Sequence, residues 1–308
     1  MSSNQVITQL SVLSLPKVTE GKVRDLYTVD ENTLLFVTTD RISAYDVVMR
    51  NGVPDKGALL TQQSAHWFRI LAEKVPGLKT HFLTTDVPAA VRADEAEIIR
   101  HRSMQVRKLR VFPLEAIVRG YVTGSAWKEY KAHGTVHGTP LPPGLRECDA
   151  VPGGPIYTPS TKAPLGQHDE NISKERAAEI VGEKYAKRIE DLALRVFRAG
   201  QEHALERGII IADTKFEFAL DEETDDVVLV DEVLTSDSSR MWPKDKYEPG
   251  RDQESFDKQF LRNWLTENGL KGKAGVEVPE DVLRATSDRY KEVFRRLTGK
   301  TLEETLQG

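Results

Sequence analysis

Residues 209–221, IIIADTKFEFALD, alternate between apolar and ionisable side chains with a period of two. In an extended strand this period sends alternate side chains to opposite faces. We therefore predict a strand whose charged face carries Asp213, Lys215 and Glu217. Its apolar face is predicted to comprise Ile210, Ala212, Thr214, Phe216, Phe218 and Leu220. Three clustered ionisable groups beside an apolar core exceed what a solvated strand edge needs, so this charged face is a candidate functional site.

The polar segment 222–226 predicts a loop that returns the chain into a second strand ending just before Asp231. A loop of these five residues would pair Asp221 with Val227. The same register would set Glu217 directly opposite Asp231. A slip of one residue would break this pairing, so the register is itself a prediction.

Two carboxylates across a ladder repel each other unless a cation lies between them. Magnesium commonly binds one or two protein carboxylates together with substrate phosphates. The pattern therefore predicts Glu217 and Asp231 as metal ligands. A solvated hairpin face, on which Lys215 only neutralises its neighbours, is the alternative and stays open.

Other segments carry clear secondary-structure signals. The turn residues 30–32 separate the β-rich runs 23–29 and 34–38, which predicts an antiparallel hairpin. Residues 111–122 form another strand-like run, whereas 134–166 are rich in Gly and Pro and are predicted to be largely irregular. Helices are predicted at 59–75, around Trp127, at 173–207 with Ser173 as N-cap and a break at Gly182, at 255–268 and at 279–297.

The strands precede the helices without the strict alternation of a doubly wound fold. This order favours an α+β fold with mostly antiparallel sheets. We place a boundary near Val111, which gives an N-terminal domain of residues 1–110 and a larger domain of residues 111–308.

Composition excludes several classes of protein. The net charge of −5, from 43 basic and 48 acidic residues, argues against a general nucleic-acid binder. The single cysteine, Cys148, cannot form an internal disulfide and fits a reducing compartment. No signal-peptide pattern is visible, and no apolar run approaches the roughly 20 residues needed to cross a bilayer. A cytoplasmic location is therefore expected.

A phosphate-binding loop is predicted near the N-terminus. Neither G-x-x-x-x-G-K-[ST] nor G-x-G-x-x-G occurs, which argues against P-loop and Rossmann sites. The segment Gly21-Lys22-Val23-Arg24-Asp25 opens the first β-rich run instead. A glycine lets the backbone approach an anion, and a lysine adds positive charge. An ordinary β-turn is the alternative and stays open.

Further side chains offer chemistry for binding polar or anionic ligands. Guanidinium forks beside hydroxyl groups suit a phosphate or a carboxylate. Arg119, Ser125 and the loop with Asp237 and Arg240 are candidates of this kind. Lys162 could reach phosphates, and His168 and Asp169 could orient a polar substrate. A surface ion pair or a solvated charged loop is the alternative for each of them.

Four segments, taken in order, resemble one known family. They are GKVRDLYTVDENTLLFVTTDRISAYDVVM, LEAIVRGYVTGSAWKEY, YTPSTKAPLGQHDENIS and IIIADTKFEFALD with VLVDEVLTSDSSRMWP. Together they are similar to phosphoribosylaminoimidazole-succinocarboxamide synthase (SAICAR synthetase), in the single-activity form typical of fungi. The resemblance covers roughly residues 21–243. A second catalytic domain is therefore not expected in the remaining length.

The resemblance implies a kinase-like antiparallel N-terminal sheet and a larger α+β domain, with ATP between them. It implies a ligase of purine biosynthesis that joins carboxyaminoimidazole ribonucleotide (CAIR) to L-aspartate through an acyl phosphate and releases ADP and phosphate. ATP and Mg2+ are the implied cofactors. The expected partners are these small molecules, with no nucleic acid and no membrane. The oligomeric state stays open, with a monomer as one option.

The resemblance also implies roles for matching residues. Lys215 and Asp213 would be catalytic, with Lys215 contacting the substrate carboxylate and the transferred phosphoryl group. Residues that would bind ATP are Gly21, Lys22, Arg24, Lys162, Glu217 and Asp231, of which Glu217 and Asp231 would also bind Mg2+. Residues that would bind substrate are Asp40, Arg41, Ser43, Arg119, Ser125, His168, Asp169, Asp237 and Arg240.

Two other functions stay open. A small-molecule phosphotransferase could use the same loop and metal pair, and it would consume ATP without aspartate. A catalytically inactive nucleotide-binding regulator is the second, although such a protein has no need of Lys215 between two carboxylates.

Overall fold

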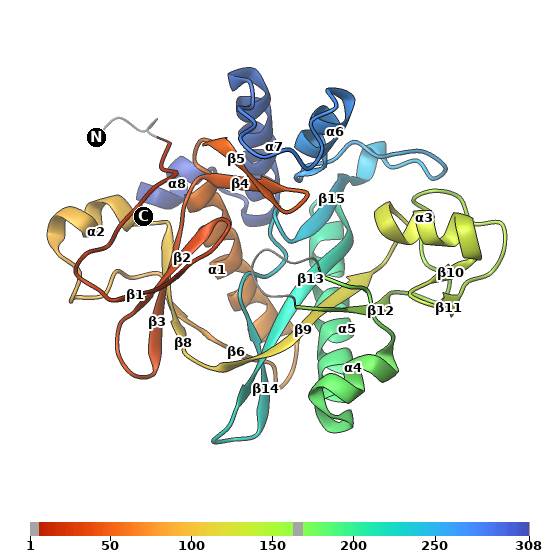
Figure 1. Ribbon diagram of the computed structural model, residues 1–308, viewed down its shortest axis with the longest axis horizontal. Helices are drawn as coiled ribbons and strands as arrows, with labels where there is room; N and C mark the ends of the chain where they lie inside the picture. Colours follow the sequence, from red (N-terminus) through yellow and green to blue (C-terminus); the bar gives the residue numbers. More distant parts are fainter. Residues whose placement is uncertain (1–5, 163–168, 308) are drawn as a thin grey trace.

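The computed structural model describes residues 6–162 and 169–307. Its N-terminal part forms a five-stranded antiparallel sheet in the order β1-β2-β3-β8-β7 (Figure 1). The strands are β1 Lys17–Glu20, β2 Arg24–Thr28, β3 Thr33–Thr38, β7 Phe82–Thr84 and β8 Ser103–Arg107. The hairpin predicted around residues 30–32 is confirmed, because β2 and β3 pair antiparallel across this turn.

A second sheet of six strands has the order β12-β9-β13-β14-β6, with β15 also paired to β13. Its strands are β6 Lys79–Thr80, β9 Arg110–Arg119, β12 Ile156–Thr161, β13 Ile209–Asp221, β14 Asp226–Val230 and β15 Ser239–Pro243. The strand predicted first from the sequence, β13, is central: β9 pairs along one edge, and β14 and β15 share the other. All pairs are antiparallel except β14 with β6. The prediction of an α+β fold with mostly antiparallel sheets is confirmed.

Two short hairpins and the helices complete the fold. The hairpins are β4 Arg41–Ala44 with β5 Val47–Gly52, and β10 Thr135–Val136 with β11 Thr139–Pro140. The helices are α1 Lys56–Lys74, α2 Ala93–Ile99, α3 Gly124–His133, α4 Lys174–Val181, α5 Glu183–Leu205, α6 Gln259–Glu267, α7 Glu280–Thr298 and α8 Leu302–Gln307, with a 3-10 turn at Lys244–Lys246. Within the described ranges, no helix is long and apolar enough to cross a membrane.

Helix boundaries follow capping chemistry that the sequence partly reveals. Ser173 accepts a hydrogen bond from the Arg176 N–H at 3.2 Å, and Gly182, with φ of 87°, separates α4 from α5. Both features were predicted. Helix α1 begins three residues earlier than expected, at Lys56. Its first turn is capped by a residue that is distant in the sequence, because the Gly57 N–H donates to Asp40 Oδ1 at 2.8 Å.

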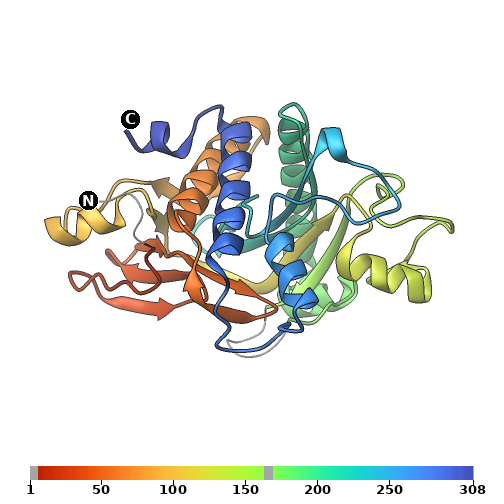
Figure 2. The same ribbon diagram turned by 90° about the horizontal axis from the view of Figure 1, so that it is seen from above.

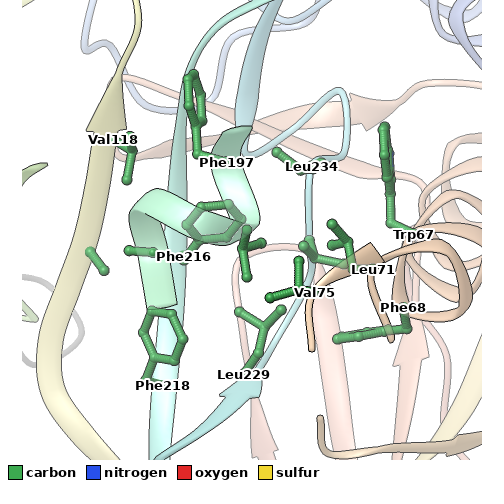
Figure 3. Packing of buried hydrophobic residues seen from close by; sticks show 14 of the residues in the cluster. Trp67, Phe68, Leu71, Val75, Val118, Phe197, Phe216, Phe218, Leu229 and Leu234 are labelled. Atoms are coloured by element: carbon green, nitrogen blue, oxygen red, sulfur yellow. The ribbon is translucent and has the colours of Figure 1, made fainter. Parts of the chain in front are cut away.

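One hydrophobic core joins both sheets. Helix α1 packs against β3 and β8 of the first sheet and against α5 and α7, while α5 covers β13 and β9 of the second (Figure 2). The core accordingly contains Phe36 of β3. It also contains Trp67 and Leu71 of α1, Phe197 of α5 and Phe216 of β13 (Figure 3). Full burial of one such side chain contributes about 1.5–3 kcal/mol to stability. The charged face of β13 is thus fixed by the rings on its opposite face.

The apolar residues of β13 do not share a single face, which corrects the prediction. Phe216 and Phe218 belong to the core that joins the two sheets. Ile210 and Ala212 instead lie in a separate cluster with Trp242. The predicted face was therefore wrong for Ile210 and Ala212.

A β-bulge explains the change of face. Opposite β15, Ile211 pairs with Met241 and Asp213 pairs with Arg240, which leaves Ala212 as an extra residue. One extra residue inverts the alternation of side chains along a strand. Strict alternation cannot reveal such an insertion.

The prediction of an irregular segment 134–166 was wrong for residues 156–161. These residues form β12, which pairs with β9 along its full length. Pro159 interrupts the usual strand pattern, but it is tolerated because β12 lies at the edge of the sheet.

Candidate active site

A polar cavity of about 650 Å³ is lined by residues of β2, β9, β13 and the segment 231–240. Most of the site residues predicted from the sequence meet here. They are Gly21, Lys22, Arg24, Ser43, Arg119, Ser125, Lys162, Asp169, Asp213, Lys215, Glu217, Asp231, Asp237 and Arg240. Residues separated by more than 200 positions in the chain thus line one concave surface.

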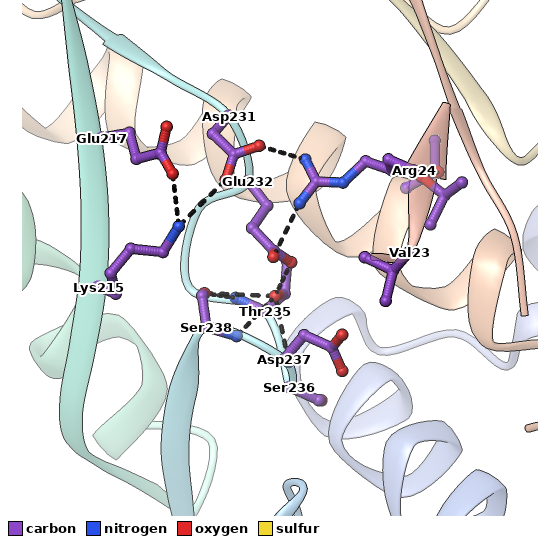
Figure 4. Close-up of polar contacts among 12 residues, drawn as sticks. Val23, Arg24, Lys215, Glu217, Asp231, Glu232, Thr235, Ser236, Asp237 and Ser238 are labelled. Carbon is purple, nitrogen blue, oxygen red and sulfur yellow. Dashed lines mark hydrogen bonds and ion pairs between the residues drawn. The ribbon is translucent and has the colours of Figure 1, made fainter. Parts of the chain in front are cut away.

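Lys215 lies at the centre of a cluster of carboxylates. Its Nζ is 2.7 Å from Glu217 Oε1 and 3.3 Å from Asp231 Oδ2 (Figure 4). Glu115 on the neighbouring strand β9 is 3.7 Å away. A cation therefore already lies between the two carboxylates that were predicted to share one.

Asp231 reaches this position by a route that differs from the predicted register. Asp221 pairs with Asp226 rather than Val227, and Glu217 pairs with Val230. The predicted register was therefore wrong by one residue, because the connecting loop is one residue shorter than expected. Asp231 follows the last ladder pair and has a left-handed φ of 66°, which turns its side chain to Lys215.

His81 supports the turn at Asp231. Its buried ring has Nε2 3.2 Å from the Asp231 carbonyl oxygen. Burial lowers the pKa of His81 to about 4, so the ring is neutral near pH 7. A neutral ring with its proton on Nε2 donates to this carbonyl.

Several cationic side chains contact the carboxylates around Lys215. Arg24 donates to Asp231 Oδ1 at 2.6 Å and to Glu232 Oε1 at 2.8 Å. Lys162 forms an ion pair with Glu217 Oε2. The positive charges around these carboxylates suit a site that also receives the phosphates of a nucleotide.

Mutual attraction fixes the ionisation of this cluster. Burial alone would lower the pKa of Lys215, but the charges of Glu217, Asp231 and Glu115 outweigh burial and raise it well above its ordinary value. Burial would raise the pKa of Asp231, but Arg24 and Lys215 lower it far below its ordinary value. Lys215 is therefore protonated and Asp231 ionised at neutral pH.

A second cluster contains two arginines around one carboxylate. Asp213 Oδ2 accepts from Arg240 Nη1 at 2.5 Å and from Arg119 Nη1 at 3.3 Å. Arg119 also donates to the hydroxyls of Thr158 at 3.1 Å and Ser125 at 3.3 Å. Two guanidinium groups on one carboxylate leave a surplus positive charge, which suits an anionic ligand.

Asp237, which is part of the turn at residues 235–238, belongs to a third cluster. Its Oδ2 is 2.8 Å from Lys56 Nζ and 2.9 Å from Lys258 Nζ, and its Oδ1 accepts from Tyr290 at 2.8 Å. The turn itself is held by hydrogen bonds among Thr235, Ser238 and neighbouring backbone groups (Figure 4). Asp237 is thus held by side chains from α1, from α7 and from the residue that precedes α6.

Two predicted substrate contacts do not line the cavity. Asp40 is fully buried, where it accepts from the N–H groups of Ile7 and Gly57. Arg41 lies behind the loop at Gly21 and donates to its backbone. Both had been assigned by their place in the matched segment, which does not distinguish a ligand contact from a residue supporting the loop. His168 lies outside the described residues.

Several lining residues escaped the sequence analysis. Glu115 pairs directly with Glu217 across β9 and β13, so it is the carboxylate that actually faces Glu217 in the ladder. The alternation of Glu115, Ile117 and Arg119 on one face of β9 was a signal for it. Glu232, Lys258 and Arg262 also line the cavity. Glu232 lies in a segment matched to the family and the other two in the predicted helix 255–268, but none of them was singled out.

A smaller cavity of about 170 Å³ shares Arg24, Lys162, Glu217 and Asp231 with the main one. Its apolar walls come from the first sheet and the start of β9. These side chains are Leu26, Leu34, Phe36, Leu109 and Val111. This smaller cavity, called the apolar slot below, therefore joins an apolar surface to the charged cluster. Such an arrangement fits a flat, partly apolar ligand that bears charged groups.

The donor set fits a hard divalent cation. The carboxylate oxygens of Glu217 and Asp231 are of the type that Mg2+ takes as ligands, although in this structure each of them contacts Lys215, Lys162 or Arg24. Within the described residues, no group of three or more His, Cys, Asp or Glu is arranged to hold a metal ion. The protein would thus supply only part of the coordination, as is usual for Mg2+ that also binds substrate phosphates.

The fold and the cavity together define an enzyme that acts on small anionic substrates at a cluster of lysines and carboxylates. Comparison with known proteins makes the assignment particular. The family model described as SAICAR synthetase matches residues 17–279. A phosphoribosylaminoimidazole-succinocarboxamide synthase of Pichia angusta is 54% identical over 292 residues, covering 93% of this chain and 96% of the relative. The chain belongs to the SAICAR synthetase family and is a ligase of purine biosynthesis.

Solved structures agree. A SAICAR synthase from Saccharomyces cerevisiae complexed with SAICAR has a TM-score of 0.86 at 48% identity and covers 96% of this chain and 99% of its own. A type-2 SAICAR synthetase in complex with ADP has a TM-score of 0.68 at 28% identity and covers 92% and 98%. The predicted family and fold are confirmed.

Proposed function

We propose that this enzyme uses Mg–ATP to phosphorylate the carboxylate of CAIR and then joins the activated carbonyl to the amine of L-aspartate. The observation that supports it best is the ammonium of Lys215 between Glu217 and Asp231, 2.7 and 3.3 Å from their oxygens. The related structures in complex with SAICAR and with ADP, which are two products of this reaction, support the proposal.

The ribonucleotide phosphate is assigned to the two-arginine cluster. Arg119 and Arg240 flank Asp213, and Ser125 adds a hydroxyl 3.3 Å from Arg119. This cluster lies two residues along β13 from Lys215, so a substrate held there by its phosphate reaches the charged cluster with its other end. Asp169 and Ser43, which also line the cavity, are assigned to the substrate as well.

The nucleotide is assigned to the opposite side of Lys215. The apolar slot bounded by Leu26 and Leu109 would take the base, because it joins the charged cluster directly. The loop at Gly21 and Lys22, with Arg24 and Lys162, would take the phosphates. Glu217 and Asp231 would hold Mg2+, which when bound offsets charge on the phosphates.

The chemistry consists of two substitutions. A carboxylate oxygen of CAIR attacks the γ-phosphorus of ATP, a P–O bond forms, and the bond to ADP breaks. The amine of aspartate then attacks the carbonyl carbon of the acyl phosphate, the C–O bond to phosphate breaks, and the amine loses a proton. Lys215 keeps its charge throughout and stabilises the negative charge that accumulates between the carboxylate and the transferred group.

A product assay tests this proposal. Purified protein with ATP, Mg2+ and CAIR should release phosphate and form SAICAR only when L-aspartate is added. Phosphorylated product without aspartate would identify a phosphotransferase instead, and binding of ATP without turnover would identify a regulator.

A further inference from the structure

We propose that Arg41 is a positioning residue that holds the backbone of the loop at Gly21 and Lys22 so that two successive N–H groups face the nucleotide phosphates. This inference rests on the proposed nucleotide site. It replaces the substrate contact that the sequence suggested for Arg41 with a role exerted through the loop.

Arg41 contacts the loop only through backbone oxygens. Its Nη2 donates to the Gly21 carbonyl at 3.0 Å and its Nε donates to the Lys22 carbonyl at 3.2 Å. Its Nη1 donates to the Thr8 carbonyl at 3.0 Å. Gly21, Lys22 and Val23 line the cavity, whereas Arg41 does not, so the guanidinium supports the loop from behind.

Because peptide bonds are planar, these contacts to the carbonyls also fix the directions of the Lys22 and Val23 N–H groups. No cis peptide bond occurs in the described residues, and in a planar trans peptide the C=O and the following N–H point in opposite directions. Because the Gly21 carbonyl points at Arg41, the Lys22 N–H points away from it. The Lys22 carbonyl fixes the Val23 N–H in the same way. Successive backbone N–H groups directed to one side form an anion-binding concavity.

These two N–H groups are free to bind a ligand as far as the described part of the chain shows. The neighbouring donor is already used, since the Gly21 N–H donates to the Arg24 carbonyl at 2.7 Å. No hydrogen bond from the N–H of Lys22 or Val23 is found among residues 6–162 and 169–307. The donors that Arg41 orients are thus also the ones without a partner there.

The guanidinium is itself held in place. Asp25, which is only 1% exposed, accepts from Arg41 Nη2 at 2.6 Å. A planar fork can donate to several fixed oxygens at once, which a lysine ammonium cannot reproduce. A Cβ on Gly21 would lie 2.8 Å from the Arg24 carbonyl oxygen, so the loop also requires glycine at this position.

Arg102 offers a matched control. Arg41 and Arg102 are each 9% exposed and each forms an ion pair with a buried aspartate. Arg102 donates to Asp40 and to the Thr38 carbonyl and does not contact the loop. Lysine at either position removes a buried guanidinium, but only Arg41→Lys releases the two loop carbonyls.

The test compares nucleotide binding in Arg41→Lys and Arg102→Lys by titration calorimetry with ADP and Mg2+, after thermal unfolding has established that each variant is folded. Arg41→Lys should weaken ADP binding roughly tenfold and raise the KM for ATP, with the KM for CAIR within about twofold of wild type. Arg102→Lys should leave ADP binding within about twofold. Unchanged ADP affinity in folded Arg41→Lys, or an equal loss in both variants, would overturn the proposal.

A measurement on the unaltered enzyme covers the case in which Arg41→Lys does not fold. In 15N-labelled protein, the amide resonances of Lys22 and Val23 should shift on addition of ADP. If ADP binds and neither resonance moves, the proposed orientation is wrong. If wild-type protein fails to bind ADP at all, the proposed nucleotide site is at fault rather than Arg41.

Discussion

At the scale of single residues, Lys215 carries the proposed chemistry. Its ammonium contacts Glu217 and Asp231 and is held in its charged form by them. The charges of Glu217, Asp231 and Glu115 raise the pKa of Lys215 well above its ordinary value, which favours the protonated form. We propose that Lys215 contributes a fixed positive charge between the carboxylate and the phosphoryl group.

We expect Lys215→Ala to lower kcat roughly 100-fold or more while changing ATP affinity only a few-fold, because the charge matters most as phosphoryl transfer proceeds. Steady-state kinetics and ADP calorimetry measure the two effects separately. Lys246→Ala, which removes an exposed lysine paired with Glu254, is the control. Equal losses in binding and turnover would mean that Lys215 serves only to bind the nucleotide.

At the scale of elements, the turn after β14 sets where Asp231 points. The residue has a left-handed φ of 66°, a conformation that costs roughly 1–3 kcal/mol for a non-glycine residue. The hydrogen bond from His81 to its carbonyl and the ion pair with Arg24 oppose that cost. Such local strain, held by its surroundings, positions a carboxylate that the ladder alone would not direct toward Lys215.

We therefore expect His81→Phe to lower kcat/KM and to weaken the Mg2+ dependence of ADP binding, because the turn at Asp231 loses its donor. His81→Gln, whose amide can replace the Nε2 donor, should recover most of both. Loss of this hydrogen bond should also lower the free energy of unfolding of His81→Phe by about 1–3 kcal/mol. Equal defects in the two variants would show that restoring a donor does not restore function, which would contradict a role for this hydrogen bond.

The same elements show which features of the fold could be predicted from the sequence. Alternation predicted β13 and its charged face, because period-two patterning is a local property. The register was wrong by one residue, and two apolar residues were assigned to the wrong face. Loop length and a bulge are settled by pairing with distant strands, and a single sequence does not display that pairing.

Sites formed by more than one element were harder to predict. Glu115 faces Glu217 only because β9 lies beside β13. The sequence suggested a substrate contact for Arg41, whereas its side chain donates to the backbone of the loop at Gly21 and Lys22. Sequence alone cannot distinguish a residue that contacts a ligand from one that holds the contacting loop. Tyr290, in a helix near the end of the chain, reaches Asp237 only through the packing of α7 against α1.

At the scale of the whole molecule, the cavity lies where the two sheets meet around α1. We propose that residues 1–110 and 111–308 act as two domains, with the nucleotide loop on the first and the substrate arginines on the second. The shared core and the pairing of β6 with β14 join them closely. The buried ion pairs of Lys56 and Lys258 with Asp237 further connect α1 and the start of α6 to the floor of the cavity.

The central claim is that the γ-phosphoryl group of ATP is transferred to the substrate carboxylate before phosphate is released. An oxygen label tests this claim most directly. CAIR labelled with 18O in its carboxylate should be incubated with the enzyme, ATP, Mg2+ and L-aspartate, and the released phosphate examined by mass spectrometry. An acyl phosphate predicts one 18O atom in each phosphate and one in the amide carbonyl. Phosphate without the label would contradict the account.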